Sequence, residues 1–143
     1  MGDANLLMVA AHVAHDARVG SSCTLANGVQ LAGHAIVEDY ATFGGLAGVG
    51  QFVRVGESAF VAAGAMCEHD VPPFVIVQGD RARVRALNVV GLRRRGVPEA
   101  SIAALKKAFR AVFMRRGLRA RAIAAVPRGD SYVDRLLDAL APK

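Results

Sequence analysis

Three of the four histidines of this chain lie in two short motifs, His12-Val-Ala-His15-Asp16 and Gly33-His34. An imidazole can take a proton from a hydroxyl group near neutral pH, and an adjacent carboxylate such as Asp16 can hold it in one tautomer. The N–H of a glycine, which has no side chain to obstruct it, can approach a carbonyl group under attack. These residue types indicate general-base chemistry at a carbonyl. A polar stripe that only hydrates the surface would explain them equally well.

A repeat of six residues supplies the element that could bring the two motifs together. Residues 1–66 divide into eleven consecutive units of six, in which the first position is always apolar and the fifth is mostly small. A period of six fits neither an α-helix nor a simple alternating strand. It is typical of a solenoid with flat faces, in which three faces make one coil of eighteen residues. The first positions are Met1, Leu7, Val13, Val19, Leu25, Leu31, Val37, Phe43, Val49, Val55 and Val61.

In such a solenoid, residues eighteen apart lie on the same face of successive coils, about 4.8 Å from each other. The sequence therefore predicts that Gly33 lies above His15 and that His34 lies above Asp16. Gln51 continues the first of these columns. We expect one patch that combines a base, a carboxylate and a backbone donor.

Net charge changes where the repeat ends. Residues 1–66 contain two basic and five acidic residues, whereas residues 67–143 contain sixteen basic and seven acidic ones. No apolar run is long enough for a transmembrane helix and no signal peptide is evident, so we expect a cytoplasmic protein.

Cys23 occupies a small-residue position and is predicted to be a buried thiol. Neither Cys23 nor Cys67 has the spacing of a metal ligand.

The same change predicts two domains. Residues 1–80 form the hexapeptide-repeat helix and an exit segment, of which 70–79 reads as a strand or loop. Residues 81–143 form a polar, basic connector and a helical domain. Pro98 and Glu99 suit the start of a helix that ends at Gly117. A shorter helix is predicted over 119–126, and Asp130 or Ser131 is expected to cap a last one.

Four stretches resemble the C-terminal half of the bacterial UDP-N-acetylglucosamine acyltransferases, within the hexapeptide-repeat transferases. They are GDANLLMVAAHVAHDARVG (2–20), LANGVQLAGHAIVEDYATFGGLAGVGQF (25–52), DVPPFVIVQGDRARV (70–84) and NVVGLRRRG (88–96). The resemblance implies a left-handed parallel β-helix of between three and four coils, followed by a small α-helical domain. It also implies transfer of an (R)-3-hydroxyacyl group from acyl carrier protein to the 3-hydroxyl of UDP-N-acetylglucosamine, the first step of lipid A biosynthesis.

The resemblance assigns roles to particular residues. His15 corresponds to the general base, Asp16 to its orienting partner and Gly33 to the oxyanion donor. Ala63 corresponds to the residue that limits the length of the acyl chain. The residues implied in substrate binding are His12, His34, Gln51, Asn88, Arg94 and Arg95. No cofactor or metal is implied.

The expected partners follow from charge and from the resemblance. The basic second part suits docking of an acidic acyl carrier protein. Nucleic acid is a weaker candidate, because no nucleic-acid motif is present and aromatic residues are scarce among the arginines. The family assembles as a homotrimer with each site between two subunits. An uncapped, short solenoid also favours association.

Two other functions remain open. Gly50 stands where the family commonly has a histidine, and Val90 replaces a carboxylate. These departures, with the absence of the family's N-terminal coils, allow a truncated non-catalytic trimeric scaffold or pseudoenzyme. The clustered histidines His12, His15 and His34 also allow a metal enzyme of the same fold, such as a γ-class carbonic anhydrase.

Overall fold

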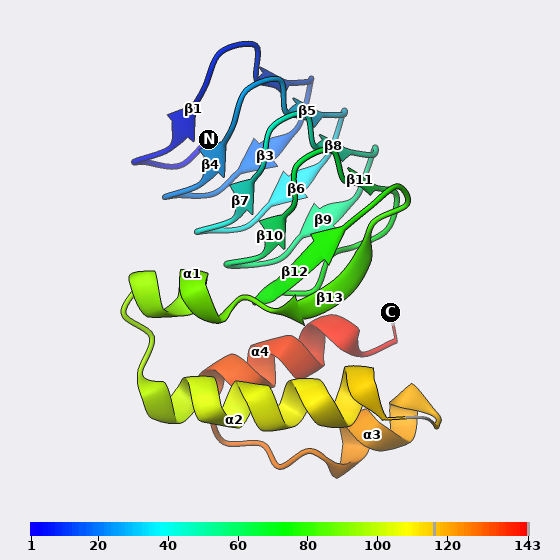
Figure 1. Ribbon diagram of the computed structural model, residues 1–143. Helices are drawn as coiled ribbons and strands as arrows, with labels where there is room; N and C mark the ends of the chain where they lie inside the picture. Colours follow the sequence, from blue (N-terminus) through cyan, green and yellow to red (C-terminus); the bar gives the residue numbers. More distant parts are fainter. Residues whose placement is uncertain (116, 143) are drawn as a thin grey trace. The chain divides into compact units, whose positions relative to one another are not determined.

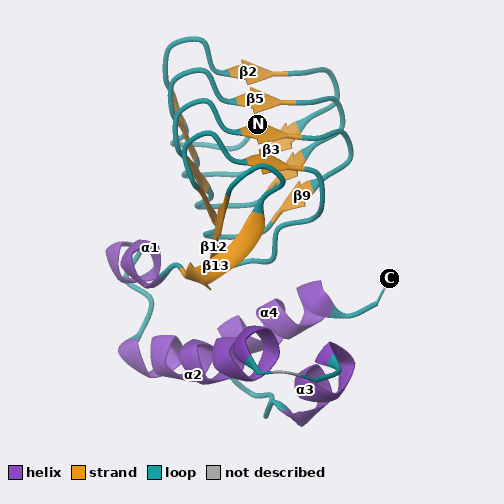
Figure 2. Ribbon diagram, turned by 45° about the vertical axis from the view of Figure 1, so that its right-hand side comes forward, coloured by secondary structure: helices purple, strands orange, loops and turns teal. Residues whose placement is uncertain are grey.

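Each strand of the repeat pairs in parallel with a strand eighteen residues away, as the six-residue pattern predicts (Figures 1 and 2). The computed structural model describes residues 1–115 and 117–142. The predicted fold class is confirmed: a left-handed parallel β-helix is followed by a small helical unit. The repeat strands are β1 (Leu6–Leu7), β2 (His12–Val13), β3 (Arg18–Val19), β4 (Thr24–Leu25), β5 (Gln30–Leu31), β6 (Ile36–Val37), β7 (Thr42–Phe43), β8 (Gly48–Val49), β9 (Arg54–Val55), β10 (Phe60–Val61) and β11 (Met66–Cys67).

These strands form three faces. One face contains β1, β4, β7 and β10, the second contains β2, β5, β8 and β11, and the third contains β3, β6 and β9. The first face continues into β12 (Val75–Gln78), which pairs in parallel with β10. The next strand, β13 (Arg83–Leu87), pairs antiparallel with β12 and lies at the edge of that sheet.

The interior of the solenoid is filled by the first and fifth positions of the repeat. Leu25 and Leu31, at first positions, and Ala35 and Ala41, at fifth positions, are completely buried. The fifth position holds mostly small side chains because it follows directly on the turn at each corner. Cys23, at a fifth position, is a buried thiol as predicted.

The fourth position of every hexad has a positive φ, which is a feature the sequence patterns did not reveal. The values lie between 53° and 71° for Ala4, Ala10, Asp16, Ser22, Gly28, His34, Tyr40, Leu46, Phe52, Ser58 and Gly64. At the corners the fifth-position N–H donates to the second-position carbonyl, as Ala17 does to Ala14 (3.3 Å) and Ala35 to Ala32 (3.2 Å). A β-turn that needs a positive φ at its third residue therefore makes each corner.

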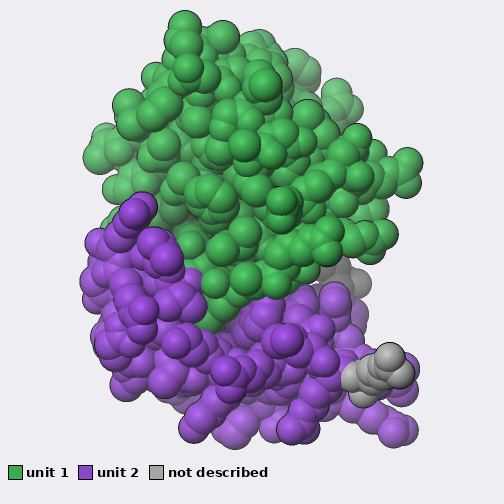
Figure 3. All heavy atoms as spheres, viewed as in Figure 1, with its two compact units in different colours: residues 1–88 green, residues 89–143 purple. Residues whose placement is uncertain are grey.

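The structure divides between Asn88 and Val89, into residues 1–88 and 89–143 (Figure 3). This division differs from the boundary at 80/81 expected from the sequence. The segment expected to be a polar connector instead forms β13. Its arginines Arg83 and Arg85 alternate with the less exposed Val84 and Ala86, so the segment has the two-residue period of a strand.

The second unit contains the helices α1 (Val89–Arg94), α2 (Glu99–Phe109), α3 (Arg119–Ala125) and α4 (Ser131–Leu140), and the π-helix η1 (Arg110–Met114) continues α2. The helix predicted to begin near Pro98 and those predicted at 119–126 and after Asp130 are present. The Asp130 side chain caps α4 by accepting hydrogen bonds from the N–H groups of Tyr132 (2.9 Å) and Val133 (3.1 Å). None of the helices within 1–115 and 117–142 combines the length and apolarity needed to cross a membrane.

We predict that Leu31→Ala strongly destabilises the solenoid. Leu31 has no exposed surface, and removing such a side chain from a packed core costs about 2–5 kcal/mol. The adjacent residue Gln30 lies on the outside of the same strand, so Gln30→Ala should cost less than about 1 kcal/mol. Chemical denaturation of the two variants measures the difference. Equal losses of stability would contradict the assignment of inward-facing positions.

Candidate active site

His15, Asp16 and His34 converge at one corner of the solenoid, between the face of β2 and β5 and the face of β3 and β6. The Nδ1 of His15 lies 3.0 Å from Oδ2 of Asp16, and Nε2 of His34 lies 3.7 Å from the same oxygen. The two imidazole rings meet edge to face, with 5.2 Å between their centres. The predicted stacking of Gly33 on His15 and of His34 on Asp16 is confirmed by the pairing of residues eighteen apart.

The backbone of the corner explains how these side chains are presented. Asp16, His34 and Phe52 are fourth-position residues in three successive coils, with φ values of 59°, 61° and 62°. Phe52 stacks on His34 with 4.8 Å between ring centres and 11° between the planes. Sequence reasoning missed Phe52, although its position eighteen residues after His34 is the signal that finds it.

The carboxylate of Asp16 determines which nitrogen of His15 can act as a base. The hydrogen bond from His15, followed by the nearby His34, lowers the pKa of Asp16 below its ordinary value. Asp16 therefore stays ionised at neutral pH and can only accept hydrogen bonds. The Nδ1 of His15 must then carry the proton, which leaves Nε2 of the neutral ring with its lone pair free.

Gly33 lies directly against this ring. A Cβ atom at residue 33 would be 2.7 Å from both Cε1 and Nε2 of His15, so any larger residue would displace the imidazole. At Ser21 and Glu57, which share the third position of the hexad with Gly33, a side-chain oxygen accepts from the backbone N–H. Within the residues that the structure describes, no acceptor is bonded to the N–H of Gly33. A buried donor of this kind is suited to an external oxygen.

Two hollows flank the corner. The first, of about 510 Å³, is lined by Asp16, Arg18, His34 and Phe52 together with Ala17 and Ile36. The second, of about 400 Å³, lies on the face of β2, β5, β8 and β11. A substrate that reaches Nε2 of His15 could therefore extend over either neighbouring face.

His12 lines the second hollow and not the first. Gly48, which also lines this hollow, makes room for the Met66 side chain, since a Cβ at residue 48 would be 2.6 Å from the Met66 sulfur. Its floor includes Cys67, and burial raises the pKa of that thiol to about 11. Cys67 is therefore a neutral packing residue at physiological pH.

The other predicted site residues occupy different places. Gln51 is exposed in the column of His15 and Gly33, and Ala63 is exposed at the corner between β10 and β11. Asn88 is buried, and its Nδ2 donates to the carbonyl of Ser58 (2.9 Å). This bond ties the end of the first unit to its last full coil.

Arg94 and Arg95 belong to the second unit. Arg94 is exposed, and the guanidinium carbon of Arg95 lies 5.8 Å from the centre of the Tyr132 ring. Their neighbour Arg93 forms a two-pronged ion pair with Glu99, with Nε–Oε1 at 2.7 Å and Nη2–Oε2 at 3.2 Å. Sequence reasoning did not anticipate this pair, which orders the turn between α1 and α2.

The cluster also has the chemistry of a metal site. One ligand atom each from His15, Asp16 and His34 lies within 4.8 Å of the others. Two imidazoles and a carboxylate suit divalent transition metals. Within the described chain, His12 is not part of this group.

Comparisons with known proteins show which family this chain resembles. A family model for UDP-N-acetylglucosamine O-acyltransferase, domain 2, matches residues 70–142. The acyl-[acyl-carrier-protein]–UDP-N-acetylglucosamine O-acyltransferases of Gloeothece citriformis and Nautilia profundicola are 49% and 46% identical over 113 residues. Each alignment covers 79% of this chain and 41% or 44% of the relative.

Solved structures extend the similarity to nearly the whole chain. The UDP-N-acetylglucosamine acyltransferase of Arabidopsis is 33% identical with a TM-score of 0.92, covering 97% of this chain and 51% of that one. The enzyme of Campylobacter jejuni is also 33% identical with a TM-score of 0.91, covering 96% and 55%. The chain thus spans about half the length of the proteins it matches. With a family model that covers half of its residues, the chain belongs to the UDP-N-acetylglucosamine O-acyltransferase family.

Proposed function

We propose that this chain forms the acyl-transfer site of an acyl-[acyl-carrier-protein]:UDP-N-acetylglucosamine O-acyltransferase. Its relatives are named for this donor and this acceptor. The acyl group would be an (R)-3-hydroxyacyl group and the acceptor atom the 3-hydroxyl of the sugar, in the first step of lipid A biosynthesis. The observation that carries the proposal is the hydrogen bond from His15 to Asp16, which leaves Nε2 of His15 as a base beside Gly33.

The reaction follows from these positions. Nε2 of His15 takes the proton of the sugar hydroxyl, and the hydroxyl oxygen attacks the thioester carbonyl. The N–H of Gly33 stabilises the negative charge that develops on the carbonyl oxygen. The tetrahedral intermediate then collapses to the ester, and the imidazolium returns its proton to the departing thiolate of the carrier. Asp16 stabilises the imidazolium between these two steps.

The other residues would hold the substrates. His12, His34 and Gln51 would line the path of the sugar and the acyl arm. Asn88, Arg94 and Arg95 would bind the nucleotide, since neighbouring guanidinium groups offer paired donors to a diphosphate. The excess of basic residues after residue 67 would attract the acidic carrier protein. The working form would be a cytoplasmic homotrimer, in which each site draws on two subunits.

Replacing the base tests the proposal directly. We predict that His15→Ala lowers acyl transfer by about 10²–10⁴-fold, while the fold is kept because the side chain is 68% exposed. The measurement uses purified 3-hydroxyacyl carrier protein and UDP-N-acetylglucosamine. His69→Ala, which changes an exposed histidine outside the cluster, is the control. A His15→Ala variant that keeps more than about a third of the wild-type rate would refute the assignment. A folded but inactive wild-type chain would favour the scaffold hypothesis.

The contact between Gly33 and the imidazole gives a second test. We predict that Gly33→Ala lowers kcat by about 10²-fold or more, because the added methyl displaces Nε2 of His15. Gly45→Ala is a matched control at the same hexad position, where a Cβ would meet only the Asn27 carbonyl oxygen at 3.5 Å. Thermal unfolding of both variants shows whether the fold survives. Equal activity in the two variants would remove Gly33 from the mechanism.

Acyl-chain selection gives a third test. The backbone of Ala63 lies against Gly44, where a Cβ would be 2.8 Å from the Ala63 Cα, so the exposed methyl of Ala63 is held in place. If this methyl limits the acyl groove, Ala63→Gly should shift the preference toward longer chains, with a misfit of about 1–3 kcal/mol for the last methylene. Values of kcat/KM across a series of 3-hydroxyacyl carriers measure the shift. Identical length profiles for the two proteins would place the limit elsewhere.

A further inference from the structure

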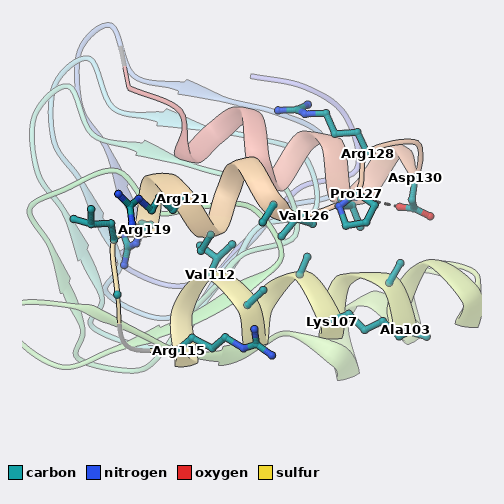
Figure 4. A pocket seen from close by; sticks show the side chains of 18 of the residues that line it. Ala103, Lys107, Val112, Arg115, Arg119, Arg121, Val126, Pro127, Arg128 and Asp130 are labelled. Carbon is teal, nitrogen blue, oxygen red and sulfur yellow. Dashed lines mark hydrogen bonds between the residues drawn. The ribbon is translucent and has the colours of Figure 1, made fainter.

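The second unit contains a cavity that plays no part in the proposed reaction. It has a volume of about 840 Å³ and lies among α2, η1, α3 and the start of α4 (Figure 4). This volume falls within the range of small-molecule sites. All the residues that line it belong to the second unit.

Short side chains leave this space open. Ala104, Ala108 and Ala111 line it from α2 and η1, and Ala122 and Ala125 line it from α3. The α3 helix packs against η1 and the α4 helix packs against α2. Alanine methyl groups cannot fill the gap that remains between α2 and α3. The surface between α2 and α3 is therefore mostly apolar.

A π-helix forms one end of the cavity. Residues 110–114 adopt this conformation, which is uncommon and is frequently found at functional sites. It places the buried Val112 in the wall and leads into Arg115 at the rim. A regular continuation of α2 would place these two residues at different angles around the helix axis.

The rim is positively charged. Figure 4 shows Arg115, Arg119 and Arg121 at one end of the cavity and Asp130 at the other. Asp130 is the only carboxylate among the described residues that line the cavity, and it already accepts hydrogen bonds from the hydroxyl of Ser101 (2.6 Å) and from the N–H groups that it caps on α4. Among the described residues, Arg115 and Arg121 have no carboxylate partner.

Two further cations at the rim are held differently. The guanidinium of Arg119 lies over the ring of Phe113, 5.1 Å from its centre. Arg128 is paired with Asp138 at 2.7 Å. Lys107, on the α2 side, has no carboxylate partner within the described part of the chain. The charge available to a ligand is thus concentrated where η1 ends and α3 begins.

We propose that this cavity binds a single-chain anionic amphiphile, with a medium-chain fatty acid anion as its ligand. The alkyl chain would lie along the alanines between α2 and α3. The carboxylate would accept paired hydrogen bonds from Arg115 and Arg121, for which guanidinium geometry is well suited. This binding is separate from acyl transfer and does not depend on the proposed function.

Calorimetric titration of the full chain with dodecanoate below its micelle concentration tests the proposal. We expect saturable binding. Ala104→Leu, whose larger side chain would occupy part of the cavity, should weaken the binding of dodecanoate by about tenfold or more. The double change Arg115→Gln with Arg121→Gln should weaken it by a similar factor, through the lost charge-assisted hydrogen bonds. The matched controls are Arg110→Gln on the same π-helix and Ala139→Leu on α4, neither of which lines the cavity.

The outcomes separate specific binding from adsorption. Dodecyltrimethylammonium, which has the same chain and the opposite charge, should bind at least tenfold more weakly than dodecanoate. Equal binding of the two amphiphiles, or dodecanoate binding that survives both Ala104→Leu and the double arginine change, overturns the proposal. So does the absence of dodecanoate binding to a chain whose circular dichroism shows an intact helical unit. Each readout is a binding constant, so failure here leaves the acyl-transfer proposal untouched.

Discussion

The parallel pairing of each repeat strand with a strand eighteen residues away is the constraint on which the rest of the first unit depends. It requires the chain to turn three times in each coil, and each turn needs a residue with positive φ. For residues other than glycine, this conformation costs about 1–2 kcal/mol. Only Gly28 and Gly64 among the eleven fourth positions avoid that cost. Burial of the first and fifth positions and the continuous hydrogen-bond ladder must offset it.

The candidate site depends on this same strained position. Asp16, His34 and Phe52 occupy it in three successive coils, so their side chains leave the corner in nearly the same direction. The first and fifth positions are committed to the core, while the third and fourth are free to carry polar groups. This separation explains how His15 and Asp16 can be more than half exposed on a solenoid whose interior is fully packed. Polar residues at the third and fourth positions of a corner therefore do not disturb the packing of the core.

Much of the first unit could be predicted because its signal is local and repeated. One apolar residue in each hexad, such as Leu25 or Leu31, defines the inward direction, and the period then places Gly33 on His15. The turn conformation could not be read in the same way, because alanine, leucine and phenylalanine at fourth positions give no sign of a positive φ. The strand at 83–87 was missed because its arginines resemble a solvated connector, and its pairing with β12 is a tertiary contact. The π-helix after Phe109 likewise keeps the apolar spacing of an ordinary helix.

The hexad of six residues and the coil of eighteen residues limit insertions and deletions in different ways. A gain or loss of six residues keeps every apolar first position facing inward, so the core remains continuous. It nevertheless moves all later residues around the axis by one face, so a change between residues 16 and 34 would carry His34 away from Asp16. Insertion of a whole coil between them would keep His34 in the column of Asp16, but two coils away and about 9.6 Å apart along the axis. The fold can therefore change length in steps of one face, while a site built from adjacent coils tolerates such changes only outside the coils that form it.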